Sequence, residues 1–468
     1  MRGWFLHTVV VALLLGGCTV GPDYVAPRPD LPSQWSEKLP VSDHRDTPPP
    51  ALWWRGFHDP VLNRLAVRAT ASNLDLRIAA QRLTEARADR DAAAASARPV
   101  ITAGLLDAEM RTSETVAWPP GIGGYRMEQG GLDVSWELDV FGGTRRAVEA
   151  ADALVGVSLE ERHAIMVSLL AEVAFDYVTL RASQARLEVA ERSIAVQRQT
   201  LALTQRAYAA GIGRDIDVAR ARAAVEIAEG QVPPLDAAVA RMSHALSVLV
   251  GGFPGDLQAE LTQAAEPGVP SPPPLPNILP SDVLRRRPDI RKAERRIAAA
   301  TAQVGVTTAE LFPRFLIPLG IGFLASDVQA LLQAQSMIWE VGVAAGQTVY
   351  DGGRSDARVR AARAVAEADR LAYLRIIRTA FREVEDSLSN LAAERRRHRA
   401  LEKAWDDERQ ALARTTKLYA QGLCDFVKVL DSQRTTVLLE DAVVQSQWHE
   451  VVDVIAFYKA TGGGWSQE

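Results

Sequence analysis

The sequence of 468 residues is poor in cysteine. Cys18 and Cys424 are the only two, too few for a disulfide framework or a CxxC zinc site. Positive charge is not in excess, because 53 Lys and Arg residues stand against 58 Asp and Glu, for a net charge of -5. This balance excludes a strongly basic nucleic-acid binder, and a hydrophobic content of 47% excludes a disordered chain. The seven histidines are scattered, with no HExxH motif, triad-like setting or phosphate-binding glycine motif. We therefore expect no enzyme activity, no metal site and no cofactor.

The N-terminus has the pattern of an export signal. An apolar run from Val9 to Leu15 is too short to span a bilayer, and small residues lead from it to Cys18. This resembles a bacterial lipoprotein signal, so residues 1–17 are predicted to be removed and Cys18 to be acylated on sulfur, which anchors the mature protein by lipid. Thr19, in place of an Asp, favours sorting to an outer membrane. Residues 18–60, rich in proline and tryptophan, are expected to form an extended strap.

The rest of the chain is an internal duplication with a shift of about 210 residues. We assign the first repeat to 61–266 and the second to 281–460, with a proline-rich linker at 267–280 and a short tail at 461–468. Four pairs of sequence segments recur in the same order in the two halves. They are Asn73–Leu76 with Arg287–Ile290, Arg98-Pro99 with Phe312-Pro313, Phe141–Arg145 with Tyr350–Arg354, and Tyr208–Gly211 with Tyr419–Gly422.

Alternation of apolar and polar residues predicts two strands in each half. The strands are expected at Val100–Thr112, Leu132–Val140, Phe315–Phe323 and Trp339–Val343. Strands of about 10 residues that are apolar on one face are typical of a transmembrane barrel with a polar interior. Asp107, Glu109 and Arg111 share one face and are assigned to that interior. Because four strands cannot close a barrel and lipid forbids an open sheet edge, the barrel must be shared between subunits.

Long helices make up most of the remainder. Thr144–Tyr208 and Arg354–Tyr419 contain no proline, so each could extend about 95 Å as a helix. Leu374–Leu391 has apolar residues at alternating spacings of three and four, which predicts a coiled-coil seam. Helices are expected to resume after Gly211 and Gly422, giving two helical hairpins per chain with those glycines at the tips. Pro233 and Pro234 should interrupt the first returning helix.

Six segments resemble the TolC-like outer-membrane factor family, and within it the NodT/OprM-like lipoprotein branch. They are TVGPDY after Cys18, SWELDVFGG at 135–143, RRPDI at 286–290, FPRF at 312–315, QTVYDGGR at 347–354 and YAQGLCDFVKVLDSQR at 419–434. The resemblance implies a mainly α fold with a membrane β-barrel. In a homotrimer, four β-strands per chain would complete a 12-stranded barrel, and a long coiled-coil α-helical barrel would continue it into the periplasm.

The same resemblance implies a periplasmic gate at the hairpin tips. Asp431 and Arg434 match an inter-helix latch, and Asp425 is placed near the constriction. Arg214, Asp215 and Asp217 are the counterparts at the first tip. The tips themselves, Tyr208 and Gly211 with Tyr419 and Gly422, are expected to contact the adaptor. Cys424 is interpreted as a free, unreactive thiol.

The function implied is that of a passive exit duct in a tripartite efflux system, located in the outer membrane of a Gram-negative bacterium and extending into the periplasm. Its expected partners are two further copies of the chain, a periplasmic adaptor (membrane fusion protein), an inner-membrane transporter of the RND type and outer-membrane lipid, with no nucleic acid. Two alternatives remain open at this point. One is an outer-membrane duct for type I protein secretion, and the other is a lipid-tethered periplasmic coiled-coil scaffold without a pore. The sequence does not indicate the substrate.

Overall fold

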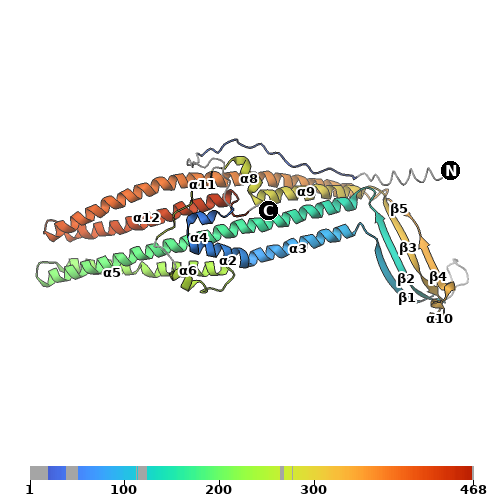
Figure 1. The fold of residues 1–468 in the computed structure, drawn as a ribbon, viewed down its shortest axis with the longest axis horizontal. Helices are drawn as coiled ribbons and strands as arrows, with labels where there is room; N and C mark the ends of the chain where they lie inside the picture. The colour runs from blue at the N-terminus through green and yellow to red at the C-terminus, as the bar shows by residue number, and fades with distance from the viewer. Residues whose placement is uncertain are drawn as a thin grey trace. The chain divides into compact units, whose positions relative to one another are not determined.

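The computed structural model describes residues 19–37, 51–111, 113, 124–263, 268–276 and 278–465 (Figure 1). The predicted signal peptide and Cys18 lie outside the described residues. The chain divides into two compact units, and each unit contains segments from both predicted repeats. Unit 1 comprises the described residues up to Arg28 with Arg82–Leu159 and Lys292–Leu374, and unit 2 comprises Pro29–Gln81, Glu160–Arg291 and Arg375–Glu468.

The duplication is visible in matching element lengths. Helices α3 (Leu74–Ala95) and α9 (Pro288–Ala309) have 22 residues each, strands β1 (Val100–Arg111) and β3 (Arg314–Ala325) have 12 each, and helices α4 (Gly143–Ala209) and α11 (Arg354–Ala420) have 67 each. The two long helices start and end 211 residues apart, from 143 to 354 and from 209 to 420. The predicted rods at Thr144–Tyr208 and Arg354–Tyr419 are confirmed almost to the residue.

The returning helices differ between the halves. The first is broken into α5 (Asp215–Glu229) and α6 (Val232–Leu249), whereas α12 (Phe426–Ala460) is continuous. Pro233 and Pro234 lie in the first turn of α6, where a missing N–H is tolerated. The predicted interruption is therefore confirmed. The shorter elements are η1 (Trp53–Phe57), α2 (Pro60–Ser72), α7 (Gln258–Gln263), α8 (Pro280–Arg286), α10 (Val328–Leu331) and η2 (Ala334–Ser336).

The strands form one antiparallel sheet of order β1-β2-β3-β4, in which β5 also pairs with β3. Strand β2 covers Gly124–Leu138, β4 covers Met337–Val341 and β5 covers Ala344–Gly346. The register of β5 on β3 continues that of β4, so the two are one strand. The interruption lies opposite Pro318, whose carbonyl accepts the Gly342 amide at 3.1 Å but which has no N–H to return. The four predicted strands are confirmed.

One face of this sheet is an exposed apolar band. Rows of paired residues cross all four strands, namely Ile101, Val134, Leu319 and Val341, and next to them Ala103, Leu132, Ile321 and Trp339. Trp339 is 72% exposed and Ile321 57%. A contiguous apolar surface of this kind is rare on a protein face in water and suits lipid.

The opposite face is polar and rich in glycine. Asp133 and Glu340 lie on it, with Gly104, Gly131 and Gly322 between them. An added Cβ at Gly131 would lie 2.7 Å from the Ile321 carbonyl oxygen, and one at Gly322 would lie 2.6 Å from that of Gly130. Adjacent strands therefore approach too closely for side chains here, as expected of a sheet curled toward its glycine face.

The register corrects one sequence expectation. Asp107 pairs with Glu128, and Glu109 with Arg126, so these charges share the face of Ile101 and Leu132, not the polar face. The assignment of Asp107, Glu109 and Arg111 to the interior was wrong, because alternation gives the period of a strand but not the face its flanking charges take. The charges lie beyond the apolar rows, where Arg126 pairs with Asp107 at 3.2 Å.

The predicted coiled-coil seams form the core of unit 2. Ile377, Val384, Leu388 and Leu391 on α11 are buried, as are Leu170, Val173, Tyr177 and Leu180 on α4. Helix α4 also contains an 18-residue stretch apolar enough to cross a membrane, but half of it is buried in the protein. Its apolar residues are accounted for by this packing. Trp53 of η1 stacks on Tyr458 with ring centroids 5.0 Å apart.

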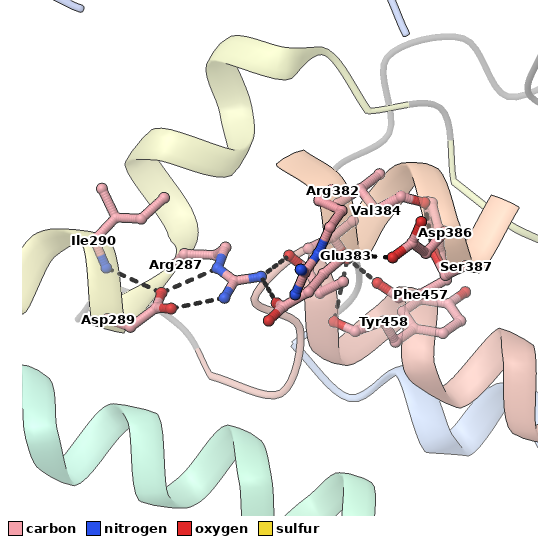
Figure 2. A network of polar contacts seen from close by, with 12 residues as sticks. Arg287, Asp289, Ile290, Arg382, Glu383, Val384, Asp386, Ser387, Phe457 and Tyr458 are labelled. Atoms are coloured by element: carbon pink, nitrogen blue, oxygen red, sulfur yellow. Dashed lines mark hydrogen bonds and ion pairs between the residues drawn. The ribbon is translucent and has the colours of Figure 1, made fainter. Parts of the chain in front are cut away.

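A buried arginine explains the RRPDI segment. Arg287 connects α8 and α9, and its guanidinium forms two hydrogen bonds to Asp289 at 3.0 and 2.6 Å (Figure 2). The same side chain donates to Glu383 of α11 at 2.6 Å and to the Ala460 carbonyl at the end of α12 at 2.9 Å. Burial lowers the pKa of Arg287, but the two carboxylates more than offset it and raise the pKa overall. One charged side chain thus ties three segments of unit 2 together.

Candidate gate at the two hairpin tips

Both predicted tips are turns of the same geometry. Gly211 has φ +75° and Gly422 has φ +72°, in the left-handed region that glycine adopts without strain. The Gly211 amide donates to Tyr208 and the Ile212 amide to Ala207, while the Gly422 amide donates to Tyr419 and the Leu423 amide to Leu418. These paired bonds are the Schellman pattern of a helix C-terminus. The spacing of Tyr-x-x-Gly therefore gives two equivalent caps, 211 residues apart.

Apolar side chains extend outward from both caps. Ile212 is 85% exposed and Leu423 70%, and Tyr208 is 53% exposed. In a Schellman cap the residue after the glycine usually packs back on the last helical turn. Here it does not, so each tip presents an apolar group to its surroundings.

Charged residues of the first tip interact with the second. Arg214 donates to both carboxylate oxygens of Asp217, at 3.0 and 3.3 Å. This hydrogen-bonded pair, with a smaller contribution from Asp425, raises the pKa of Arg214. Burial first and Asp217 second raise the pKa of the Tyr419 phenol, so Tyr419 also belongs to this cluster. Four of the residues singled out from the sequence are thus brought together: Arg214, Asp217, Tyr419 and Asp425.

Asp215 does not join this cluster. Its side chain is exposed and accepts a hydrogen bond from the Ile216 amide at 2.7 Å. Asp215 and Asp217 both lie in the first turn of α5, where negative charge stabilises a helix. For Asp215 the structure shows only this local role.

Asp431 and Arg434 lie exposed on α12. Neither makes a hydrogen bond or ion pair with another side chain that the structure describes. Between them, Ser432 and Gln433 are buried. Ser432 donates to Glu408 of α11 and Gln433 donates to Thr200 of α4 at 3.0 Å. Because one side of α12 is tied within the chain, Asp431 and Arg434 are left to face other molecules.

Cys424 is partly buried next to the second tip and is a free thiol. Its Sγ lies 3.5 Å from the Thr415 carbonyl oxygen, a weak contact that packs the turn against α11. No group of three or more His, Cys, Asp or Glu side chains among the described residues could hold a metal ion.

Sequence reasoning missed the residues that hold the tip region together. Thr200 and Glu408 lie in none of the recurring segments, and Gln433 lies within the 419–434 segment without a role assigned to it. A signal existed, because a glutamine and threonines on the apolar seams of otherwise aliphatic coiled coils are expected to find partners across the seam. Which partner each finds depends on helix register, which the sequence does not supply.

Comparison with known proteins agrees with this architecture. The family model described as outer membrane efflux protein matches residues 65–252 and 279–463, once in each half. The antibiotic efflux pump outer membrane protein ArpC of Pseudomonas putida is 30% identical over 99% of this chain and 96% of its own length. Nodulation protein T of Rhizobium leguminosarum bv. trifolii is 29% identical over 100% of this chain and 98% of its own.

Solved structures show the same fold. The outer-membrane channel OprN superimposes with a TM-score of 0.89 at 34% identity, covering 96% of this chain and 100% of that one. The open state of the MtrE outer membrane channel of Neisseria gonorrhoeae gives a TM-score of 0.84 at 25% identity, covering 96% of this chain and 99% of that one. With the duplicated helices, the exposed apolar sheet and the paired tips, these matches show that the chain belongs to the outer membrane efflux protein family of outer-membrane channels.

Proposed function

We propose that three copies of this chain form one passive duct that carries small solutes from an inner-membrane transporter across the periplasm and outer membrane. The observation that carries the proposal is the sheet itself. Its four strands expose an apolar face, and β1 and the β4–β5 strand have no neighbouring strand on their outer sides among the described residues. Lipid does not tolerate open edges, and three such sheets joined edge to edge make a closed barrel of 12 strands.

The polar, glycine-rich face would then line the duct. Asp133 and Glu340 lie on that face, so the lumen would carry negative charge and favour cations. A lumen of this kind offers water and little shape selectivity, which leaves selection of the substrate to the transporter. Relatives are named for efflux of antibiotics, toluene and cations, so we propose drugs or other small solutes as cargo.

Closure of the duct is assigned to the hairpin tips. Arg214 with Asp217 and Asp425 forms a polar cluster within one chain, and Asp431 with Arg434 faces outward from α12. In a trimer the outward pair would meet a neighbouring chain and act as the latch. Opening would be an untwisting of the inner hairpins that separates these pairs.

The tips are also the proposed contact with a periplasmic adaptor, itself coupled to an RND-type transporter. The exposed apolar groups at Ile212 and Leu423, next to Tyr208 and Tyr419, support this. Cys18 is proposed to carry lipid. An outer-membrane duct for type I secretion would share this architecture and differ in its partners. A scaffold without a pore does not fit, because it has no use for the exposed apolar sheet.

The mass of the detergent-extracted complex tests the proposal. Native mass spectrometry should give three chains per particle. A monomer that stays monodisperse in several detergents would contradict the shared barrel.

A further inference from the structure

The first described residues, from Thr19 to Tyr24, are held tightly within unit 1. Arg146, at the start of α4, is buried with only 5% of its side chain exposed. Its guanidinium donates to the Val20 carbonyl at 3.2 Å, to the Gly21 carbonyl at 3.4 Å and to Asp23 at 2.7 Å. Three acceptors on one short segment are thus bound by a single buried cation, an arrangement that fixes both position and direction of the segment.

Glycines make a close contact possible between residues 19–24 and the surface on which they lie, which we call the seat. Gly21 has φ +91°, and a Cβ there would lie 2.5 Å from the Gly305 Cα. A Cβ on Gly142 would lie 2.8 Å from Thr19, and one on Gly305 would lie 2.7 Å from the Arg146 side chain. Contacts this short are not possible, so the seat accepts this backbone only because the three positions lack side chains.

A second attachment follows within four residues. The Tyr24 ring packs against Ala153, Ala298 and Ala299. Its hydroxyl donates to Glu294 at 3.0 Å, and burial together with Glu294 raises the pKa of the phenol. Tyr24 therefore remains a protonated donor at any physiological pH. The segment is held at both ends.

The seat lies at the junction between strand β2 and helix α4. The Val20 amide donates to the Phe141 carbonyl at 3.1 Å, and Phe141 lies between the end of β2 at Leu138 and the start of α4 at Gly143. The apolar rows of the sheet end at that point. Covalent geometry keeps the Cα of Cys18 within about 3.8 Å of that of Thr19. The segment that directly follows Cys18 is therefore held at the edge of the apolar band.

We propose that the N-terminal segment is held by an anchor clamp, formed by Arg146, Gly142, Gly305 and the residues that contact Tyr24. This clamp fixes the lipid of Cys18 to the junction of β2 and α4. The acyl chains then enter the inner leaflet directly beside the barrel strands. A lipid anchor on a free tether only holds a protein near the membrane, whereas a clamped one sets the depth of the adjoining sheet and raises its effective concentration in the bilayer. This inference rests on the proposed lipidation of Cys18.

The sharpest test changes the segment and leaves the body intact. Gly21→Ala should displace residues 19–24 from the seat, and Gly255→Ala is the matched control, since Gly255 also has a positive φ (+100°) but nothing within 4 Å of an added Cβ. Hydrogen exchange of the peptide containing Val20 should become at least about tenfold faster in Gly21→Ala. The fraction of protein resisting carbonate extraction should fall severalfold. The control should match the wild type in both measurements.

A double variant separates a clamp from a merely structural contact. In a Cys18→Ser background, Gly21→Ala should cause no further loss of carbonate-resistant protein, because no lipid remains to be positioned. An equal further loss in that background would overturn the clamp. Arg146→Met is a second probe of the same clamp. Arg370→Met is its control, because in the part of the chain that the structure describes Arg370 pairs only with Glu367, one turn away.

Labelling with radioactive palmitate distinguishes the two levels of the proposal. Label on wild type and on Gly21→Ala, with loss of membrane retention only in the latter, supports the clamp. If both proteins are labelled and Gly21→Ala changes neither the hydrogen exchange of the Val20 peptide nor the retention in the membrane, the clamp is overturned. The proposal that Cys18 is lipidated would still hold. No label on the wild type overturns the lipidation, and the clamp with it.

Discussion

The side-chain amide of Gln433 on α12 donates a hydrogen bond to the hydroxyl of Thr200 on α4 at 3.0 Å, and both side chains are buried. This bond joins the two hairpins of one chain a short distance from their tips. On the same helix, Asp431 and Arg434 are exposed, and neither has a partner among the described side chains. One side of α12 therefore bonds to the other hairpin of the same chain through Gln433. The other side, with Asp431 and Arg434, is free to contact a neighbouring molecule.

Breaking the buried bond should loosen the hairpin pair. Thr200→Val removes the acceptor, keeps the volume and leaves the Gln433 amide buried without a partner, which costs about 1 to 3 kcal/mol. We expect a lower thermal midpoint and a higher open probability in planar bilayers. Thr416→Val is the control, because among the described residues the Thr416 hydroxyl bonds only to the Leu412 carbonyl of its own helix.

The outward pair should control conductance without affecting folding. Asp431→Ala combined with Arg434→Ala removes two exposed side chains, and surface changes of this kind alter stability by less than about 0.5 kcal/mol. We expect ion conductance of the trimer to rise while the thermal midpoint stays the same. Unchanged conductance in a properly assembled trimer would remove Asp431 and Arg434 from the gate.

Arg287 should be one of the costliest positions to change in unit 2. Arg287→Met leaves Asp289 and Glu383, whose side chains are 40% and 42% exposed, without their shared partner. Because water still reaches both carboxylates, the loss is that of hydrogen bonds to a charged group, about 1 to 3 kcal/mol. The loss is measured by denaturant unfolding of the detergent-solubilised protein. Arg285→Met, whose side chain is 72% exposed and pairs with Asp282, should change stability little. Similar losses for the two variants would contradict the role assigned to the Arg287 network.

Two carboxylates predict a pH dependence of stability. Burial raises the pKa of Asp176 to about 6, helped by Glu172, and raises that of Asp453 to about 6, helped by Glu394 and Glu450. Their ordinary value is 3.8, so the folded protein binds protons more tightly than the unfolded chain. The stability they contribute is present below pH 3.8 and is lost as the pH rises through about 6.

Asp453→Asn should therefore stabilise the protein at pH 7.5 by about 1 to 2 kcal/mol, allowing for partial exposure, and flatten the fall between pH 4 and pH 6. The thermal midpoint measured across that range checks this. Asp407→Asn, an exposed change on α11, should leave the pH profile unaltered. An Asp453→Asn variant whose midpoint runs parallel to that of the wild type from pH 4 to pH 7 would contradict the assignment for Asp453.

Local patterns were sufficient to predict most of the fold. The Tyr-x-x-Gly segments specify the caps at Gly211 and Gly422, because only a left-handed residue ends a helix in this way. Absence of proline predicted the two long helices, and period-2 alternation predicted the strands. Each of these features depends on residues close together in the chain.

Pairings across long sequence distances could not be predicted in this way. Asp107 was assigned to the wrong face because its face depends on register with β2. The contact of Arg146 with Asp23 joins residues 123 apart, and that of Gln433 with Thr200 joins residues 233 apart. Such contacts depend on how whole elements pack, and one sequence does not specify which polar group meets which.

The most direct test of the account is single-channel conductance of the purified protein, measured on the same sample as its oligomeric mass. We expect a trimer with small, cation-selective conductance, because acidic side chains would nearly close the periplasmic end of the duct. A silent bilayer from correctly folded protein, or a monomer, would contradict a channel shared among three chains.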